Sequence, residues 1–202
     1  MTMYVPAHFR EEDQESIHAL VRSSPFGLLL TNGSTVPEVT HLPMLLEVDP
    51  SGERILGHLA LANPHAKMLQ TGACALAVFS GEQGYITPRW YADPNLVPTW
   101  NYRVVHAHGT VRRVEEEPEL MALVDALTAV HESGAQSPWS ADWSNPKVSR
   151  LLKAIVGFEL QVTRWEAKAK LSQNRAPEDQ EALRKNLLAH DQPETLVHTK
   201  TP

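Results

Sequence analysis

The sequence predicts a mainly β fold of the α+β class, an antiparallel barrel with helices packed outside it. Two observations carry this prediction. Five or six short apolar runs with strand character recur along the 202 residues, and most of them are joined by short turns. Segments with apolar side chains at helical spacing lie between several of these runs, and the chain is long enough to bury a sizeable core.

The elements of the first fifty residues follow from apolar spacing and turn residues. Residues 11–23 are expected to form a helix, because apolar side chains recur there at helical spacing, and Pro25 ends it. A strand over 26–31 follows, and Asn32-Gly33 is a turn signal. An extended pattern resumes over 36–48, where two prolines indicate an edge strand or a bulge.

Two further strands are expected on either side of a short helix. Residues 55–60 form the first of them, and Asn63 then caps a helix that ends near Gln70. Residues 73–79 form a buried strand, and we expect its Cys74, the one cysteine of the chain, to be a small buried hydrophobe.

Residues 81–98 differ from the segments around them. Glycines and prolines interrupt this stretch, which also carries Tyr85, Trp90 and Tyr91. Its glycines and prolines disfavour a regular helix or strand, and its aromatic residues are unusual for a fully solvated loop. We expect a long irregular loop, and such loops are often functional.

The second half of the chain alternates strands and helices. Strands are expected over 100–114 and 156–165, because apolar residues there follow a period of two. Helices are expected over 118–131, from a cap at Asn145 to about residue 154, and over 177–188.

The end of the chain is expected to add little to the core. Residues 167–175 are mostly polar and form a connection to the last helix, and 190–202 carry few apolar residues. We therefore expect residues 1–189 to be a single domain and 190–202 to be a disordered tail.

Composition excludes several classes of function. No apolar run approaches the roughly 20 residues needed to span a membrane, and no signal peptide begins the sequence. A single cysteine forms no internal disulfide. These features indicate a cytoplasmic protein. The net charge of −6 and the lack of a basic cluster argue against direct binding to nucleic acid, although a local patch in three dimensions stays open.

Several nucleotide and hydrolase motifs are missing from the sequence. No GxGxxG follows a strand, and neither GxxxxGK[ST] nor GxSxG occurs. A Rossmann dinucleotide site and a P-loop ATPase are therefore disfavoured. No acid/base pair or nucleophile is specific enough to be named catalytic.

Histidines raise the question of a metal. His106 and His108 are two residues apart on one strand face, and His41 or His58 would be candidate further ligands. The alternative is that they are neutral histidines bonded to backbone or solvent. No HExxH or CxxC frame supports a metal, so we favour this second interpretation and expect no metal site.

The start of the short helix is a candidate anion site. Asn63, His65 and Lys67 follow a strand, and free amides at a helix start favour an anion such as a cofactor phosphate. The alternative is an ordinary capped helix with a solvated lysine. Taken alone, this alternative is favoured.

Two other segments suit a planar heterocycle. Trp100 and Tyr102 give a flat wall, and Asn101, pointing the other way, donates and accepts hydrogen bonds as imide edges require. The alternative is that these are core aromatics. Residues 168–175 hold six side-chain donors in eight residues, which would suit a ligand. The alternative is a polar loop that closes onto the last helix.

Taken in order, these strings resemble the PaiB-type family, described as FMN-binding negative transcriptional regulators, from about Met3 to Leu188. The strings are Tyr4-Val5-Pro6 with His8-Phe9, His41-Leu42-Pro43, Gly57-His58-Leu59-Ala60 with Ala62-Asn63-Pro64, Tyr85-Ile86 with Pro88 and Trp90-Tyr91, Pro98-Thr99-Trp100-Asn101-Tyr102, His131-Glu132, and Lys170-Leu171-Ser172-Gln173-Asn174.

The resemblance implies a six-stranded antiparallel split barrel that forms a homodimer, with one FMN in each of two clefts at the interface. Carried over by position, the residues expected near the phosphate are His58, Asn63, His65 and Lys67. Those expected near the flavin ring are His41, Pro43, Trp100, Asn101 and Tyr102. Those expected to close the pocket are Lys170, Ser172, Gln173 and Asn174.

The expected function is an FMN-binding split-barrel protein, either a flavin-dependent oxidoreductase or a redox-linked negative regulator of transcription. Two alternatives stay open. One is a direct transcriptional repressor without enzymatic activity. The other is a haem-binding split-barrel protein that uses a histidine such as His106 or His108.

Overall fold

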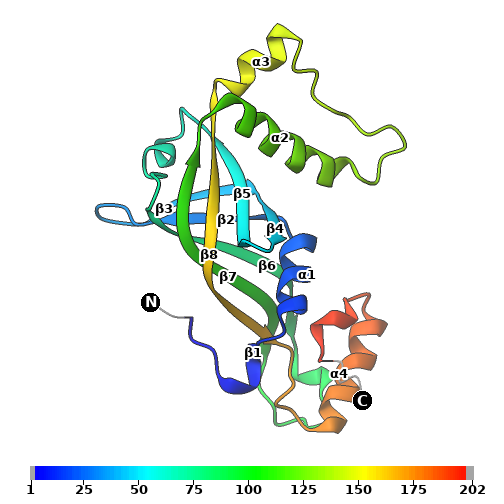
Figure 1. The fold of residues 1–202 in the computed structure, drawn as a ribbon. Helices are drawn as coiled ribbons and strands as arrows, with labels where there is room; N and C mark the ends of the chain where they lie inside the picture. Colours follow the sequence, from blue (N-terminus) through cyan, green and yellow to red (C-terminus); the bar gives the residue numbers. More distant parts are fainter. Residues whose placement is uncertain (1–2, 199–202) are drawn as a thin grey trace. The chain divides into compact units, whose positions relative to one another are not determined.

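The computed structural model describes residues 3–198, which form two compact units (Figure 1). Unit 1 contains the residues up to Ser24, 80–105 and those from Glu166 on, and unit 2 contains 25–79 and 106–165. Whether the two form the single domain expected for 1–189 stays a prediction.

The strands form one mainly antiparallel sheet in the order β3-β2-β6-β7-β8-β5-β4, with β1 paired to β8. The strands are β1 (Arg10–Glu11), β2 (Phe26–Thr31), β3 (Glu38–Pro43), β4 (Leu45–Asp49), β5 (Gly52–Ala60), β6 (Cys74–Ile86), β7 (Thr99–Val114) and β8 (Ile155–Lys170). The α-helices are α1 (Gln14–Ser23), α2 (Glu117–Glu132), α3 (Pro146–Leu152) and α4 (Pro177–Ala189). Short 3-10 helices span Ala7–Phe9, Pro64–Lys67, Pro88–Trp90 and Glu194–Leu196.

The described residues hold eight strands where six were expected. The segment expected as one strand over 36–48 is divided at Met44, whose backbone N–H bonds to the carbonyl of Pro25 at 2.8 Å. Before this point β3 pairs with β2, and after it β4 pairs with β5. The buried Met44 therefore marks the change of partner. The two-residue β1 was not expected.

The expectation of an irregular loop over 81–98 is wrong for its first part, because β6 continues to Ile86. Buried and exposed residues alternate there, as in a strand. The glycines that suggested a loop are instead positions where neighbouring side chains pack closely. A Cβ on Gly84 would lie 2.6 Å from Leu196 Cδ1. Likewise β8 continues to Lys170, into the expected polar connection, because Ala167 and Ala169 are buried on one side of it.

Unit 2 has apolar side chains on both faces of its sheet. On one face Leu29, Ile55, Phe79 and Phe158 are fully buried. On the other face α2 packs on β5 and β8, and the cluster there comprises Leu56, Val114, Leu120, Leu123, Leu127 and Leu152. A Cβ on Gly157 would lie 3.0–3.1 Å from three of these side chains, so this glycine lets α2 approach the sheet closely.

Unit 1 has its core under α4 and the segment that follows it. That core comprises Ile86, Tyr91, Leu183, Leu187, Leu196 and Val197. The chain was expected to lack structure from residue 190, but residues 190–198 pack back onto the unit. The N–H of His198 bonds to the carbonyl of Leu171 at 3.0 Å. Leu196 and Val197 anchor this polar tail, because both are buried in the core of the unit and Leu196 packs on Gly84. Residues 199–202 lie outside the described part.

Two smaller points complete the fold. Cys74 was expected to be buried, but it is the first residue of β6 and its side chain is exposed. Among residues 3–198, no helix combines the length and the apolar character needed to cross a membrane.

Candidate functional site

His65, expected at the phosphate, is instead the centre of a closed hydrogen-bond network in unit 2. Its Nε2 lies 2.9 Å from Thr31 Oγ1, and its Nδ1 lies 2.8 Å from Thr40 Oγ1. The residue is buried, and burial lowers the pKa of the imidazole, against a smaller opposing effect from the Glu38 carboxylate. Both ring nitrogens are therefore occupied and the ring is neutral, which suits a structural role better than an anion contact.

Asn63 is committed to the same network. Its side-chain oxygen accepts a hydrogen bond from the backbone N–H of His65 at 3.0 Å, and its Nδ2 donates to Thr40 Oγ1 at 3.2 Å. The helix that it caps is a single 3-10 turn, Pro64–Lys67. Of the residues expected near the phosphate on this turn, only the exposed Lys67 keeps its charged group available.

His58, the fourth residue expected at the phosphate, lies in β5 two positions after Leu56, so the two share the strand face covered by α2. Its Nδ1 is buried and has no hydrogen-bond partner among the described residues. Burial lowers the pKa of this imidazole, so it is neutral at pH 7. The structure does not place its side chain with Asn63 and His65.

His41 and Pro43, expected near the flavin ring, lie in β3 on an exposed apolar face of unit 2. Both side chains are exposed. Phe26 of β2 pairs with Pro43 and is 65% exposed, and its ring stacks on His41 with centroids 6.5 Å apart. A contiguous exposed apolar patch of this kind is typical of an interaction surface.

In unit 1, Trp100 and Tyr102 line an open aromatic face of β7, as the period of two predicts. Trp100 is 55% exposed and meets Tyr85 of β6, which is 50% exposed, edge to face at a centroid distance of 6.1 Å. Tyr102 is half-buried, and Lys168 Nζ of β8 lies over its ring at 5.4 Å. We call Tyr85, Trp100, Tyr102 and Lys168 the aromatic face of unit 1.

Lys170 extends this face with further positive charge. Its Nζ donates to Thr99 Oγ1 and to the carbonyl of Trp100, which uses two of its three N–H groups. Burial lowers the pKa of this ammonium, and the nearby charges of Lys168 and Arg175 lower it further. Within residues 3–198 none of these three cations forms an ion pair. The cluster therefore favours an anion.

Asn101, expected to contact the flavin edge, is fully buried and fully bonded. Its Nδ2 donates to Ser172 Oγ at 2.9 Å and to the carbonyl of Leu196 at 2.8 Å, and its Oδ1 accepts from Ser172 Oγ at 3.2 Å. Ser172 has a φ of 61° and also contacts the Tyr91 hydroxyl at 3.2 Å. Both side chains lock the turn after β8 and the C-terminal segment in place.

The other two closing residues divide in the same way. Gln173 accepts a hydrogen bond from the N–H of Leu171 at 2.7 Å and donates to the carbonyl of Ala169, so its amide shapes the turn. Asn174 is exposed. Of the closing segment, Lys170 and Asn174 are the side chains that keep groups free for a ligand.

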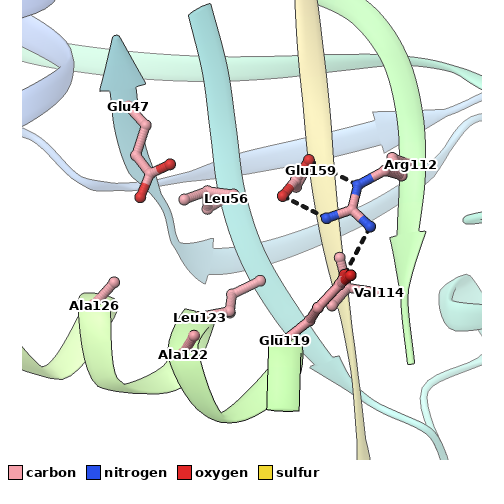
Figure 2. Close-up of a pocket in the computed structure, with 9 residues that line it drawn as sticks. All are labelled: Glu47, Leu56, Arg112, Val114, Glu119, Ala122, Leu123, Ala126 and Glu159. Carbon is pink, nitrogen blue, oxygen red and sulfur yellow. Dashed lines mark hydrogen bonds and ion pairs between the residues drawn. The ribbon is translucent and has the colours of Figure 1, made fainter. Parts of the chain in front are cut away.

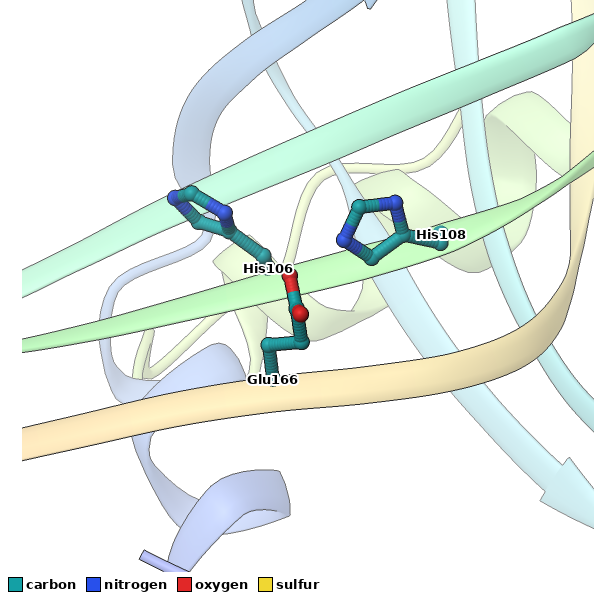
Figure 3. A group of neighbouring side chains, drawn as sticks. All are labelled: His106, His108 and Glu166. Atoms are coloured by element: carbon teal, nitrogen blue, oxygen red, sulfur yellow. The ribbon is translucent and has the colours of Figure 1, made fainter. Parts of the chain in front are cut away.

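The histidines considered as metal ligands lie together on β7. Figure 3 shows the two side chains projecting from this strand. The ring centroids of His106 and His108 are 6.3 Å apart. Their spacing on one strand face agrees with the period of two. Neither His41 nor His58 is part of this pair: His41 stacks on Phe26 and His58 lies on the face under α2.

A hollow of about 210 Å³ under α2 holds an ion-pair cluster that the sequence did not reveal (Figure 2). Arg112 Nε and Nη2 donate to the two oxygens of Glu159 at 2.8 and 2.7 Å, and its Nη1 donates to Glu119 at 2.7 Å. These carboxylates raise the pKa of the Arg112 guanidinium, and the hydrogen bonds from Arg112 hold the pKa of the Glu159 carboxyl below its usual value. Because three of the five guanidinium N–H groups of Arg112 bond to these two carboxylates, the cluster fastens α2 to the sheet.

Comparison with known proteins decides the family. A family model described as "Putative FMN-binding domain" matches residues 3–164. The chain is 34% identical over 178 residues to protease synthase and sporulation protein PAI 2 of Bacillus subtilis, covering 88% of this chain and 85% of that protein. The chain belongs to the PaiB-type FMN-binding family. The resemblance drawn from the ordered sequence strings is confirmed, and so is a flavin as the cofactor of the family.

Solved structures show the fold of this PaiB-type chain. The FAD and haem binding protein of Mycobacterium smegmatis superposes with a TM-score of 0.65 at 19% identity, over 86% of this chain and 79% of that one. The flavocytochrome Anf3 of Azotobacter vinelandii gives a TM-score of 0.64 at 18% identity, over 82% and 72%. The expected mainly antiparallel α+β fold is confirmed.

Sequence reasoning missed three parts of the site region. Tyr85 was assigned to a loop because of the glycines beside it, although alternation past Gly84 would have continued the strand. Lys168 was recognised only as one of several hydrogen-bond donors, and its position over the Tyr102 ring was not predicted. Arg112 and Glu159 lie far apart in sequence, and no local pattern connects them.

Proposed function

We propose that this PaiB-type protein is a cytoplasmic homodimer that binds FMN on the aromatic face of unit 1. In this proposal the isoalloxazine ring packs on Trp100 and Tyr102, and Lys170 with its neighbouring cations attracts the anionic part of the cofactor. The observation that carries the proposal is a cluster of three cations beside this face, without ion pairs among the described residues: Lys168 lies over the Tyr102 ring, Lys170 bonds to the carbonyl of the exposed Trp100, and Arg175 lies near Lys170.

The chemistry of these side chains fits a flavin phosphate. An exposed tryptophan gains from covering by a flat ring, since the ring removes apolar surface from water. Lys170 keeps one N–H free after its bonds to Thr99 and Trp100. The positive charges of Lys168 and Arg175 repel its ammonium group. An anion at this cluster would relieve the mutual repulsion of the three cations.

Bound FMN would supply the redox chemistry, and the chain would orient it. Trp100 and Tyr85 would exclude water from one face of the ring, and Lys168 would hold positive charge beside it. Asn101, Ser172 and Gln173 would act through the turn they lock, which carries Lys170 at its start.

The homodimer is proposed because apolar surface is left open in each unit. Phe26 and Val39 in the β2–β3 pair are 65% and 46% exposed, and Trp100 in unit 1 is 55% exposed. Apolar patches of this kind usually mark an interface, and a second copy would cover them as the family resemblance implies. A solution mass near the monomer value of 22.5 kDa by light scattering at micromolar concentration would contradict the proposal.

The decisive experiment is a titration of the cofactor-free protein with FMN, followed by flavin fluorescence. Because a charged contact contributes about 1.5–3 kcal/mol, Lys170→Ala should weaken FMN binding about 10- to 100-fold. Lys185→Ala, an exposed change on α4, is the matched control and should have no effect. If wild type shows no saturable binding at high micromolar FMN, the cofactor proposal fails.

For regulation of transcription we propose an indirect route without contact to DNA. The net charge of −6 repels a duplex, and the cluster beside the aromatic face holds only Lys168, Lys170 and Arg175. Binding of a promoter fragment should be weak and unspecific in a gel-shift assay at physiological salt. Nanomolar affinity in the presence of competitor DNA would overturn this and favour a direct repressor.

A further inference from the structure

A second hollow lies in unit 1, on the side of β7 opposite the aromatic face. It has a volume of about 520 Å³, within the range of small-molecule sites. It is lined by α1 from Ser16 onward, by the middle of β6, by β7 and by Thr195. Because side chains alternate along a strand, Arg103 points into this hollow while Trp100 and Tyr102 lie on the other face. None of the residues proposed for flavin lines it.

Arg103 is a cation without a counter-ion in this hollow. Within residues 3–198 its side chain forms no hydrogen bond or ion pair, and of its nitrogens only Nε is buried, so the two Nη groups stay open to a ligand. The planar fork of arginine matches a carboxylate, which accepts two parallel hydrogen bonds. The residue is therefore set to receive a carboxylate from a ligand.

The hollow also offers a place for positive charge. The Glu82 carboxylate lines it and accepts a hydrogen bond from the Thr195 hydroxyl. The last turn of α1, with Ser23 and Ser24, lines it too, and a helix C-terminus favours a cation. An anion with no positive group, bound at Arg103, would be repelled by the Glu82 carboxylate and by the C-terminal end of α1. A ligand with a positive group beside its carboxylate would satisfy all three.

The remaining wall is apolar and open. Ala19 and Leu20 of α1 form it. At Gly81 of β6 an added Cβ would lie 3.2 Å from Leu20 Cδ1 and 3.4 Å from Arg103 Cβ. Any side chain at this position would narrow the hollow, so the glycine keeps it open.

We infer that this hollow binds a small zwitterion, a free amino acid with an aliphatic side chain. Its carboxylate bonds to the guanidinium of Arg103. Its ammonium group lies toward Glu82 and the C-terminal end of α1, and its side chain packs on Ala19 and Leu20. This site is separate from the proposed flavin site, since the two lie on opposite faces of β7.

The test is isothermal titration of the full-length protein with L-leucine and with two fragments of it. Isocaproate is leucine without its amino group, and isoamylamine is leucine without its carboxylate. We expect saturable binding of leucine that is stronger than that of either fragment. Arg103→Gln should weaken leucine about 10- to 100-fold, and Glu82→Gln should weaken leucine but not isocaproate. Arg22→Gln, an exposed cation on α1 outside the hollow, should change nothing.

Gly81→Val is the second variant, since it keeps every charge and fills the space. It should weaken leucine as well, which keeps the inference testable if Arg103→Gln fails to fold by circular dichroism. No binding at millimolar leucine, or isocaproate binding as tightly as leucine, would overturn the inference. FMN affinity is measured separately, so failure of this site and failure of the flavin proposal are distinguishable.

Discussion

Replacing Asn101 by alanine tests whether this residue stabilises the fold or contacts the flavin directly. The amide is fully buried, and its Nδ2 donates to Ser172 Oγ and to the carbonyl of Leu196. Removing it leaves the Leu196 carbonyl without its donor, at a cost of about 1–3 kcal/mol. Ser172 keeps its contact with Tyr91, so its loss is smaller, about 1 kcal/mol. The free energy of unfolding should fall by about 2–4 kcal/mol in all.

The assay is urea unfolding followed by tryptophan fluorescence. With an m-value near 2 kcal/mol/M, the midpoint should fall by about 1–2 M urea. Asn174→Ala is the matched control, because Asn174 is exposed in the same turn and its loss should be nearly neutral. The reasoning is refuted if Asn101→Ala unfolds at the wild-type midpoint while the folded variant loses FMN affinity, because Asn101 would then be a flavin contact.

Three further predictions follow from particular contacts. If Lys170 binds the anionic part of FMN, Lys67→Ala should leave FMN affinity unchanged in a fluorescence titration. A loss of about 10- to 100-fold, as expected for a charged contact, would instead indicate that the phosphate binds at the 3-10 turn Pro64–Lys67. Gly84→Ala should lower the melting temperature in calorimetry, since its Cβ would lie 2.6 Å from Leu196 Cδ1; an unchanged melting temperature would mean that the C-terminal segment moves aside at no cost. Arg112 holds the pKa of Glu159 below its usual 4.5, so this ion pair stabilises the fold above that pH and the stabilisation is lost as the pH falls through the lowered pKa. The stability deficit of Glu159→Gln in urea unfolding should therefore be largest at pH 7 and shrink at low pH, and a deficit independent of pH would contradict the ion-pair role.

The sequence by itself determined most of the elements and the family. Helical spacing located α1, α2 and α4 within a few residues, because an amphipathic stripe is a local property of the chain. The order of motif strings identified the PaiB-type family, since it needs no contact information. The period of two along β7 placed Trp100 and Tyr102 on one open face.

Tertiary structure decided which polar side chains are free. Asn63, His65, Asn101 and Gln173 looked like cofactor groups, yet each is bonded to its own protein, and three of them reach partners distant in sequence. Hydrogen-bond capacity is finite, so a side chain already saturated across the fold has little left for a ligand. The sequence states which groups a residue carries. Only the folded chain decides whether those groups remain unpaired, as at Lys170 and Arg103.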